Sequence, residues 1–347
     1  EHEYEDFLKL SGIEVNTQIS YIKLLLNFLF SNKPHVSQRF ISKKFKNKLE
    51  NILNEKSFDF VQIEGLYVLQ YINTIRKNFK GKILYRSHNI EFLIWKRNYE
   101  KTSSILKKVY FKSLFNRLQK LEKKLINTYD YLIPISQTDA NIYKELGNNK
   151  PVLTSPFGID FKKVKEQSVD NNISLVQNIN YIGALDWIPN QEGLLWFIDN
   201  CFPKIIKSFP HITLNIAGRN APRWLQKKLE HKNIIFLGEV KNAYEFIQTP
   251  GSMIVPLFSG SGMRVKIIEG MALKKTIVAT NIATEGIHCI HNENIILANN
   301  VNDFANSIIT LLIKPELQID IGENAHDFVK EHFDFEKIGS DILNFIK

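Results

Sequence analysis

The residues best suited to chemistry lie between positions 256 and 287, where small and charged residues follow an apolar run. The apolar run at 253–258 predicts a buried strand, and a loop of alternating serine and glycine follows it at 259–262. The apolar residues 267, 268, 271 and 272 then predict an amphipathic helix. Two glycines in such a loop let backbone N–H groups approach a ligand closely, and the helix start favours an anion.

Charged side chains stand where a diphosphate would bind. Arg264 and Lys266 lie near the predicted helix start, next to the loop residues Ser261 and Gly262, and add positive charge there. Glu269 lies about one turn further along and could reach a pair of hydroxyl groups. Together these residues predict a pocket for a nucleotide diphosphate. The alternative is an ordinary glycine–serine loop with solvated cations in the first helical turn, which is common in α/β domains.

Composition describes a chain of two ordinary domains. The 347 residues are 44% hydrophobic and 12% aromatic, which is enough for substantial cores. Cys201 and Cys289 are far apart and give no disulfide framework, so we expect a reducing, cytoplasmic location. No apolar run approaches the ~18 residues that a membrane span requires. No Asp-x-Asp pair is present, so no metal site and no cofactor are expected.

Positive charge is concentrated in the first part of the chain. Residues 1–150 hold 26 Lys and Arg against 15 Asp and Glu, whereas the remainder holds 19 against 21. From Lys96 to Lys124, ten cations stand against two glutamates, with apolar residues at helical spacing, which predicts one basic amphipathic helix. This helix could rest on anionic lipid head groups, or it could pack on the core with a solvated face. The cations lack the interleaved aromatic residues of a nucleic-acid binder.

Strand and helix patterns alternate along most of the chain and predict parallel sheets. Residues 1–57 are expected to form a short strand at 13–19 and helices at 21–30 and 37–54. Later strand patterns lie at 58–64, 82–88, 131–135, 180–183, 212–217, 234–237, 253–258 and 276–279. They predict an α/β fold of two doubly wound Rossmann-like domains facing a cleft. The domains span 1–152 and 153–330, and a last helix at 331–347 could pack back across the joint.

Four segments resemble successive loops of a nucleotide-sugar site. They read YIGALDWIPNQEG, NIAGRNAP, FLGEV and PLFSGSGMRVKIIEGMA, and they resemble the family 4 retaining glycosyltransferases, or glycosyl transferases group 1. The resemblance is strongest over residues 181–286 and implies the GT-B fold, with an acceptor-side first domain and a second domain that binds the nucleotide sugar. It also implies that Glu269 holds the nucleotide ribose. The family's second glutamate, eight residues earlier, is replaced by Ser261, which breaks the usual pair.

The resemblance also assigns the leaving diphosphate. The family often binds it with an arginine and a lysine after the first strand of the second domain. Here those places hold Ala184 and either Asn190 or Gln191, so we infer that Arg264 and Lys266 act instead.

Further donor contacts are implied at the ends of other strands. Arg219 is a candidate for phosphate or base contact, and Glu239 with Val240 matches the turn whose backbone holds the nucleobase. Thr284 lies in a segment similar to the loop that closes the site. The alternatives are a surface arginine before a helix and plain strand-to-loop turns.

The first domain contributes two candidates beyond the ends of parallel strands, where ligands bind in such sheets. His88 resembles the histidine that the family places between donor sugar and acceptor, and Glu64 is a candidate for acceptor hydroxyls. A purely structural histidine is the alternative. The family's glycine-rich loop after the first strand has no counterpart in residues 1–57, so we expect the first β-α units of this domain to be missing.

These features predict a retaining, metal-independent hexosyltransferase. It would move a sugar from a nucleotide-sugar donor to a glycan or lipid-linked acceptor in surface polysaccharide assembly, as a cytoplasmic enzyme that could be peripheral on the inner face of the membrane. Two alternatives stay open. One is a nucleotide-sugar 2-epimerase, and the other is a non-catalytic GT-B partner subunit, since Ser261 and the missing glycine-rich loop depart from the family pattern.

Overall fold

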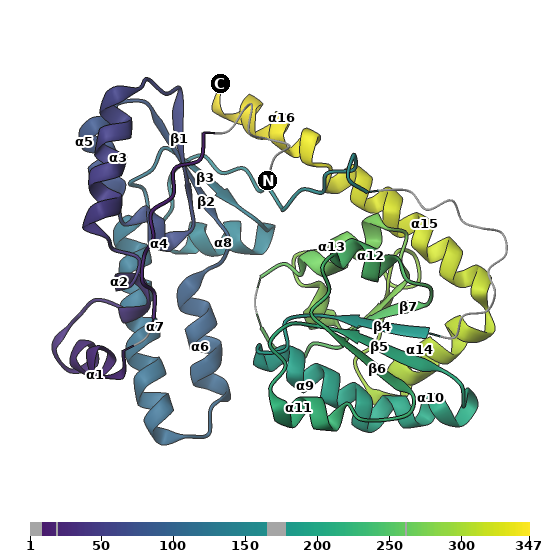
Figure 1. Ribbon diagram of the computed structural model, residues 1–347. Coiled ribbons are helices and arrows are strands. Elements are labelled where there is room, and N and C mark those ends of the chain that lie inside the picture. The colour runs from purple at the N-terminus through teal and green to yellow at the C-terminus, as the bar shows by residue number, and fades with distance from the viewer. Residues whose placement is uncertain (1–8, 19, 165–177, 261) are drawn as a thin grey trace. The chain divides into compact units, whose positions relative to one another are not determined.

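The protein divides into two compact α/β units, Glu1–Thr154 and Ser155–Lys347. The computed structural model describes residues 9–18, 20–164, 178–260 and 262–347. Each unit is built on its own parallel sheet (Figure 1). The predicted α/β class with parallel sheets is therefore confirmed.

The first unit contains a parallel sheet with the strand order β1-β2-β3. The core lies around this sheet, where Leu84, Leu118 and Leu132 are fully buried. Its elements are α1 (Tyr21–Phe30), α2 (His35–Gln38), α3 (Lys43–Glu55), β1 (Phe60–Glu64), α4 (Leu66–Leu69), α5 (Ile72–Asn78), β2 (Lys82–Ser87), α6 (Glu91–Lys101), α7 (Ile105–Leu125), β3 (Tyr131–Pro134) and α8 (Gln137–Glu145).

Two predictions for the start of this unit are wrong. Residues 13–18 form no strand, and residue 19 lies outside the described residues. The helix predicted at 37–54 is broken into α2 and α3, because Ser42 has an extended backbone and its hydroxyl caps α3 by accepting the N–H of Phe45. The Tyr71 hydroxyl fixes the break, since it donates to the Phe40 carbonyl and accepts the Ser42 N–H, both at 2.7 Å.

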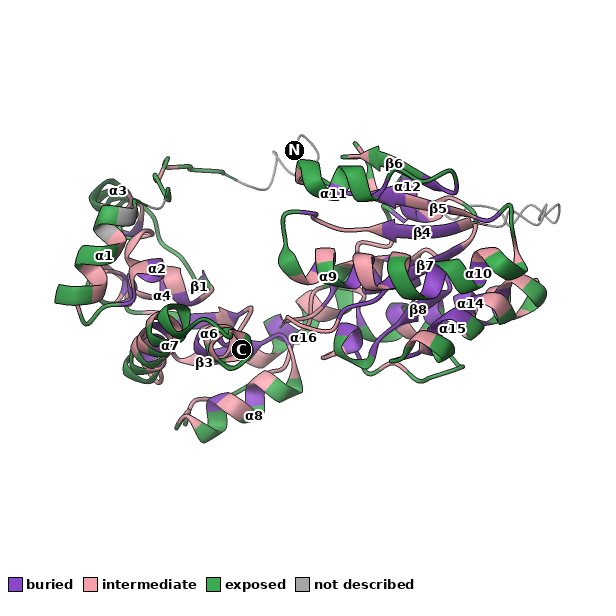
Figure 2. Cartoon of the chain, turned by 90° about the horizontal axis from the view of Figure 1, so that it is seen from below, coloured by how far each residue is buried: buried purple, intermediate pink, exposed green. Residues whose placement is uncertain are grey.

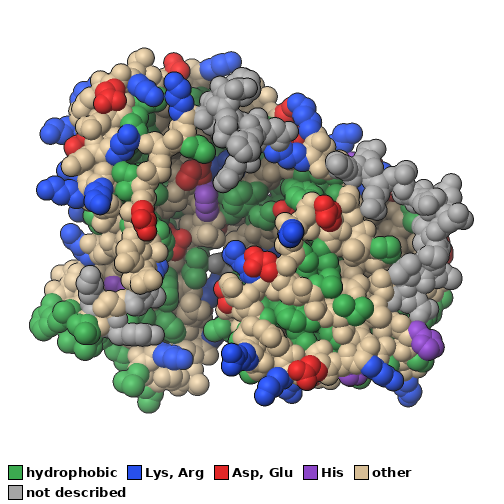
Figure 3. Space-filling model, in the orientation of Figure 1, with side chains coloured by type: hydrophobic (Ala, Val, Ile, Leu, Met, Phe, Trp, Pro, Cys, Tyr) green, Lys and Arg blue, Asp and Glu red, His purple; other side chains and the backbone are tan. Residues whose placement is uncertain are grey.

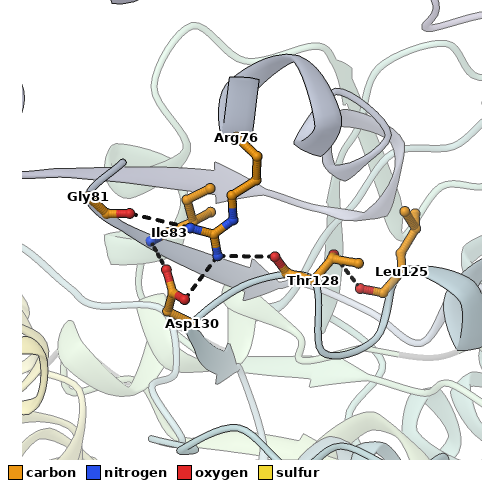
Figure 4. A network of polar contacts seen from close by, with 6 residues as sticks. All are labelled: Arg76, Gly81, Ile83, Leu125, Thr128 and Asp130. Atoms are coloured by element: carbon orange, nitrogen blue, oxygen red, sulfur yellow. Dashed lines mark hydrogen bonds and ion pairs between the residues drawn. The ribbon is translucent and has the colours of Figure 1, made fainter. Parts of the chain in front are cut away.

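A partly exposed polar network holds the start of β2 and the segment before β3 together (Figure 4). Arg76 of α5 pairs with Asp130 at 2.9 Å between Nη2 and Oδ1. The same guanidinium donates to the carbonyls of Gly81 and Thr128 at 3.3 and 3.1 Å. The second Asp130 oxygen accepts the N–H of Ile83 at 2.7 Å. These contacts fix the amino-terminal edge of the sheet, opposite the edge at which ligands bind in such folds.

The basic run from Lys96 to Lys124 is a helical hairpin rather than the single helix predicted. α6 and α7 lie side by side and are joined at residues 102–104 (Figure 1). Thr102 and Ser104 have extended backbones, and a run of Ser and Thr favours a turn because these side chains compete with helical hydrogen bonds. The rings of Trp95 and Phe111, with centroids 5.7 Å apart, pack the two helices together.

Glu122 is the one acidic residue of α7, and it is 3% exposed. Its carboxylate accepts the backbone N–H groups of Glu91 at 3.0 Å and of Phe92 at 3.4 Å, which are the first residues of α6. It therefore caps α6 from a neighbouring helix, at a terminus whose dipole favours negative charge. Burial nevertheless raises the pKa of Glu122 to about 8, because desolvation outweighs the two hydrogen bonds.

The second unit contains a larger parallel sheet with the strand order β6-β5-β4-β7-β8-β9. Its elements are β4 (Asn178–Ile182), α9 (Ile188–Trp196), a π-helical stretch (Phe197–Cys201), α10 (Phe202–Ser208), β5 (Thr213–Ala217), α11 (Arg223–Lys228), β6 (Ile234–Gly238), α12 (Ala243–Gln248), β7 (Ser252–Val255), α13 (Val265–Ala272), β8 (Ile277–Ala279), a 3₁₀ turn (Asn281–Thr284), β9 (Ile296–Leu297), α14 (Val301–Ile313), α15 (Pro315–His332) and α16 (Phe335–Ile346). The five predicted strands are present, and β9 was not predicted.

Both faces of this sheet are buried. Ile254 and Val278 belong to one apolar cluster, whereas Met253 and Val255, the strand neighbours of Ile254, belong to another. Successive side chains of a strand point to opposite faces, so the two clusters lie on the two sides of the sheet. Figure 2 shows β4, β7 and β8 buried between helices. This burial explains why the strands read as continuous apolar runs in the sequence.

Gly193 sets how closely α9 approaches the segment after β7. A Cβ at this position would lie 1.7 Å from the carbonyl oxygen of Pro256, which is backbone and cannot rotate away. The absence of a side chain therefore brings the middle of α9 next to the loop that leads into α13.

We expect Gly193→Ala to lower the free energy of unfolding of the second unit by about 3 kcal/mol or more, since α9 or the loop after β7 must move. Gly339→Ala is the matched control, because α16 offers open space at that glycine. That variant should gain stability by about 0.5–1 kcal/mol from helix propensity. Denaturant titration of both variants tests the packing, and equal stabilities would contradict it.

Glu122→Gln should flatten the pH dependence of the stability of the first unit. The pKa of Glu122 is raised in the folded state to about 8, so this group contributes stability below the unfolded pKa and loses it as pH rises through the folded value. The free energy of unfolding of the variant should therefore rise, relative to that of the parent protein, by about 1 kcal/mol or more between about pH 5 and pH 8.

Denaturant titration across this pH range measures the free energy of unfolding. Amide hydrogen exchange within α6 reports on the first unit specifically. Glu100→Gln serves as the control, because Glu100 is exposed on the same hairpin. Stability curves of Glu122→Gln that run parallel to those of the parent protein at every pH would contradict the assignment.

Candidate functional site

The candidate site of the second unit lies where the strand order reverses. β5 and β6 stand on one side of β4, and β7 to β9 stand on the other (Figure 1). Ligands of open parallel sheets bind at such a reversal, beyond the carboxyl ends of the strands. Here β4 ends at Ile182 and β7 at Val255, and α13 begins nearby at Val265. The helix start has no side-chain cap, so its N–H groups and dipole favour an anion.

Lys266 of α13 reaches across this reversal to the end of β4. Its ammonium donates to the Ile182 carbonyl at 2.9 Å and to the Asn190 side-chain oxygen at 3.4 Å. It also lies 5.0 Å from the centroid of the Tyr181 ring. Although part of the residue is exposed, the charged nitrogen is enclosed by these groups. Burial, with a smaller effect of Arg264, lowers the pKa of Lys266 to about 7.

Arg264 precedes α13 and links the loops that follow β4 and β7. It is 7% exposed, and its guanidinium lies 5.5 Å from the centroid of the Trp187 ring. Its Nη1 donates to the Gly262 carbonyl. Gly260, at φ 113°, leaves room for this arrangement, because a Cβ there would lie 2.8 Å from both Arg264 Nη2 and the Trp187 ring. Arg264 and Lys266 therefore bring two positive charges to one end of the sheet.

Glu269 is the third predicted residue on this segment. Glu269 is partly buried on α13, and burial raises the pKa of its carboxyl group. Among the residues that the structure describes, the carboxylate has no hydrogen bond and no ion pair. Burial raises the pKa of the Tyr244 phenol on α12, and the nearby Glu269 carboxylate raises it further. A half-buried carboxylate whose oxygens have their acceptor sites open can accept hydrogen bonds from a pair of ligand hydroxyls.

The remaining candidates of the second unit follow other strands at the same edge. Arg219 follows β5 and is exposed. After β6, Glu239 is exposed and Val240 is partly buried. Thr284 comes after β8 and is buried, with its hydroxyl donating to the Asn281 carbonyl at 3.1 Å. Ser261 lies outside the described residues. The topology thus groups these side chains at one edge. Arg264 and Lys266 reach the end of β4 and the loop after it through their side chains, and the Arg219 carbonyl accepts the Leu185 N–H of that loop at 2.9 Å.

Asn190 and Trp187 have roles that the sequence did not reveal. The resemblance places a family lysine at Asn190 or Gln191, and the ammonium of Lys266 hydrogen-bonds Asn190 instead. The Asn190 amide nitrogen is in turn fixed by the Ala184 carbonyl at 2.8 Å. The sequence signalled this only by the missing cations after β4, at Ala184 and at Asn190 or Gln191, which left Arg264 and Lys266 as the substitutes.

In the first unit, the structure brings Glu64 and His88 together. Glu64 ends β1 and His88 follows β2, and the imidazole Nε2 lies 2.5 Å from a Glu64 carboxylate oxygen. Gln62 donates to the other Glu64 oxygen. The carboxylate orients the imidazole, because Nε2 must act as the donor to it.

A second carboxylate lies next to this pair and was missed. Glu91 begins α6, and its carboxylate accepts the Tyr67 hydroxyl at 2.7 Å. Burial raises the pKa of Glu91, and the nearby His88 opposes that rise. The sequence offered a weak signal, since Glu91 stands three residues after His88 at a predicted helix start.

Two general findings bear on the chemistry. Within the described ranges, no cluster of three or more His, Cys, Asp or Glu side chains is suited to hold a metal ion. None of the helices in those ranges is both long and apolar enough to span a bilayer. Cys201 and Cys289 are free thiols, and burial raises the pKa of both to about 12.

Comparison with known proteins finds similarities that centre on the second unit. Residues 176–314 match the family described as Glycosyl transferases group 1. An uncharacterized 44.6 kDa protein in the cps region of Klebsiella pneumoniae is 29% identical over 86% of this chain and 77% of its own length.

Two solved structures have the same fold over nearly the whole chain. Sucrose-phosphate synthase from Thermosynechococcus elongatus has a TM-score of 0.69 at 16% identity and covers 89% of this chain and 77% of that one. HepE from Anabaena, in complex with UDP-glucose, has a TM-score of 0.65 at 16% identity. The match covers 94% of this chain and 89% of that one. The predicted GT-B fold is thereby confirmed. Residues 176–314 are thus similar to the glycosyl transferases group 1, and the chain has the GT-B fold.

Proposed function

We propose that this protein is a retaining, metal-independent glycosyltransferase that moves a hexosyl group from a nucleotide-sugar donor to a glycan or lipid-linked acceptor. The observation that carries the proposal is the pair of cations at the strand-order reversal. Arg264 and Lys266 lie at the uncapped start of α13, and Lys266 reaches the end of β4. Two side-chain charges and a helix dipole then favour the same dianionic group.

The chemistry follows from where charge develops. The bond between the anomeric carbon and the diphosphate oxygen breaks, so negative charge grows on that oxygen while the sugar becomes cation-like. Preorganised positive groups aimed at the leaving oxygen lower the barrier. The acceptor hydroxyl then bonds to the anomeric carbon, and the leaving phosphate takes the hydroxyl proton. Arg264 and Lys266 supply the charge in this scheme, so neither a protein nucleophile nor a metal is needed.

Other residues would hold the rest of the donor. Glu269 has no hydrogen bond or ion pair within the described residues, and in the proposed complex it accepts bonds from the ribose hydroxyls. The turn at Glu239 and Val240 holds the nucleobase through its backbone, and Arg219 contacts phosphate or base. The Asn190 amide positions Lys266 rather than touching the donor.

The first unit would bind the acceptor. The Glu64 carboxylate fixes the His88 imidazole, and a ring oriented in this way can align an acceptor hydroxyl or the donor sugar. The related protein from the cps region of Klebsiella pneumoniae supports a role in surface polysaccharide assembly. HepE was solved with UDP-glucose, which makes that donor the natural first probe. We place the reaction in the cytoplasm, at the inner face of the membrane.

Arg264→Ala should lower the turnover of the donor about 10²- to 10³-fold, the usual loss when one preorganised donor to a leaving oxygen is removed. Release of UDP from UDP-glucose, as slow hydrolysis without acceptor, provides the assay; if UDP-glucose is not turned over, a panel of nucleotide sugars replaces it. Arg223→Ala is the matched control, since Arg223 is exposed at the start of α11. Turnover within a few-fold of the parent protein would remove Arg264 from the chemistry. Binding without turnover of any donor would favour a non-catalytic partner subunit.

Donor binding should take up a proton at Lys266. Its pKa is lowered to about 7 in the free protein, and a bound diphosphate favours the charged form and raises that pKa. Affinity should therefore fall as pH rises above about 7, by up to about tenfold per pH unit. UDP-glucose is the right probe because its diphosphate does not titrate near neutrality.

Calorimetry in buffers of different ionisation enthalpy measures this proton uptake. Lys266→Met should abolish it and weaken binding at low pH. Lys275→Met is a close control, because Lys275 is also buried with a pKa lowered to about 7, but it precedes β8 at the opposite edge of the sheet. Equal proton uptake by Lys266→Met and the parent protein would show that Lys266 does not face the diphosphate.

A further inference from the structure

Helix α1 turns its most apolar face to solvent. Ile22, Leu25, Leu26, Leu29 and Phe30 are between 52% and 81% exposed. Their spacing of three and four residues places them on one side of the helix. An amphipathic helix normally buries such a stripe against the core, so this face requires another explanation.

The opposite side of α1 is attached to α7. Arg117 donates to the carbonyls of Asn27 at 3.1 Å and Phe28 at 2.8 Å, which satisfies acceptors at the end of α1. Phe28 also packs against Tyr110, with ring centroids 6.1 Å apart. The orientation of α1 is therefore set by specific contacts, and the apolar face points outward because the other face is bound.

The tip of the α6–α7 hairpin carries a second exposed apolar set. Ile105, Leu106 and Val109 are between 55% and 84% exposed. Four exposed lysines surround them at positions 101, 107, 108 and 112. Glu100 precedes this set and no Asp or Glu follows it before Glu122, so this end of the hairpin carries a net positive charge.

We propose that the apolar face of α1 and the hairpin tip together form a docking surface for an anionic lipid bilayer. Tyr110 and Arg117 of α7 contact α1, so α1 lies along the first two thirds of the helix that begins at the tip. Figure 3 shows hydrophobic side chains gathered over the region where Figure 1 places α1. Apolar side chains enter the boundary between head groups and acyl chains, while the lysines bind the anionic head groups.

Charge favours lipid over the other occupants of such a surface. A second copy of this chain would bring the four lysines of one tip against those of another, and like charges disfavour that contact. An anionic bilayer gains about 1 kcal/mol for each Lys near its surface. The surface also differs from the one that the sequence suggested, since it consists of α1 and the hairpin tip, not the whole length of residues 96–124.

This proposal extends the proposed function, because a lipid-linked acceptor is presented at a membrane, yet its residues lie outside the transfer chemistry. Membrane binding and donor turnover can therefore fail separately. UDP-glucose hydrolysis measured without vesicles reports on the transferase site alone, and vesicle binding measured without donor reports on the docking surface alone.

The test is co-sedimentation of the full chain with vesicles of phosphatidylcholine alone or mixed with phosphatidylglycerol. We expect binding to the mixed vesicles that weakens as salt is added, and little binding to phosphatidylcholine alone. Lys107→Gln/Lys108→Gln should weaken the binding more than about tenfold, and Leu25→Ser/Leu29→Ser should weaken it at every salt concentration. Neither variant should change donor hydrolysis without vesicles.

Controls come from the second unit. Lys227→Gln/Lys228→Gln removes two exposed lysines of α11, and Ile290→Ser/Ile313→Ser removes two exposed apolar residues. Both should bind vesicles like the parent protein. Equal losses for control and docking variants, or no vesicle binding by the parent protein, would overturn the proposal. A dimer that Leu25→Ser/Leu29→Ser converts to a monomer, without loss of vesicle binding, would assign the α1 face to self-association instead.

Discussion

The contact on which the second unit depends is that of the Lys266 ammonium with the end of β4. The ammonium is enclosed by a carbonyl, an amide oxygen and the face of Tyr181, and none of these carries a full negative charge. Desolvation of an unpaired cation is costly, which is why the pKa falls to about 7. An anion bound at the start of α13 would stabilise the same charge. The contact therefore fastens α13 to β4 and prepares the site for a diphosphate.

The sequence predicted much of this unit because its strands are buried on both faces. Five apolar runs marked five strands, and the glycine–serine loop before residues 264–269 marked the segment at the strand-order reversal. What could not be predicted was the partner of Lys266. Asn190 is far away in sequence, and its amide faces Lys266 only because Gly183 and Gly193 let the loops approach closely. Such contacts depend on three-dimensional packing, which periodicity does not encode.

The first unit was harder to predict because the breaks between its helices have only weak signals in the sequence. The apolar spacing that begins at Leu106 and the cations that begin at Lys96 predicted one long helix, and they outweighed a short run of Thr and Ser at 102–104. The hairpin reveals the role of Glu122, which the sequence presents only as an acid among lysines. By capping α6, Glu122 fixes the helix that begins just after His88, and so it helps hold the edge where His88 meets Glu64.

The hairpin links the docking surface to that edge. Leu106 lies at its exposed tip and Glu122 near its base, and 16 residues of helix at about 1.5 Å each separate them by about 24 Å. Because Arg117 of α7 also holds α1, a docked surface includes α1 as well as the tip, and Glu122 with the Glu64–His88 edge lies beyond it. Vesicle binding and the orientation of the His88 imidazole therefore depend on different parts of the same hairpin.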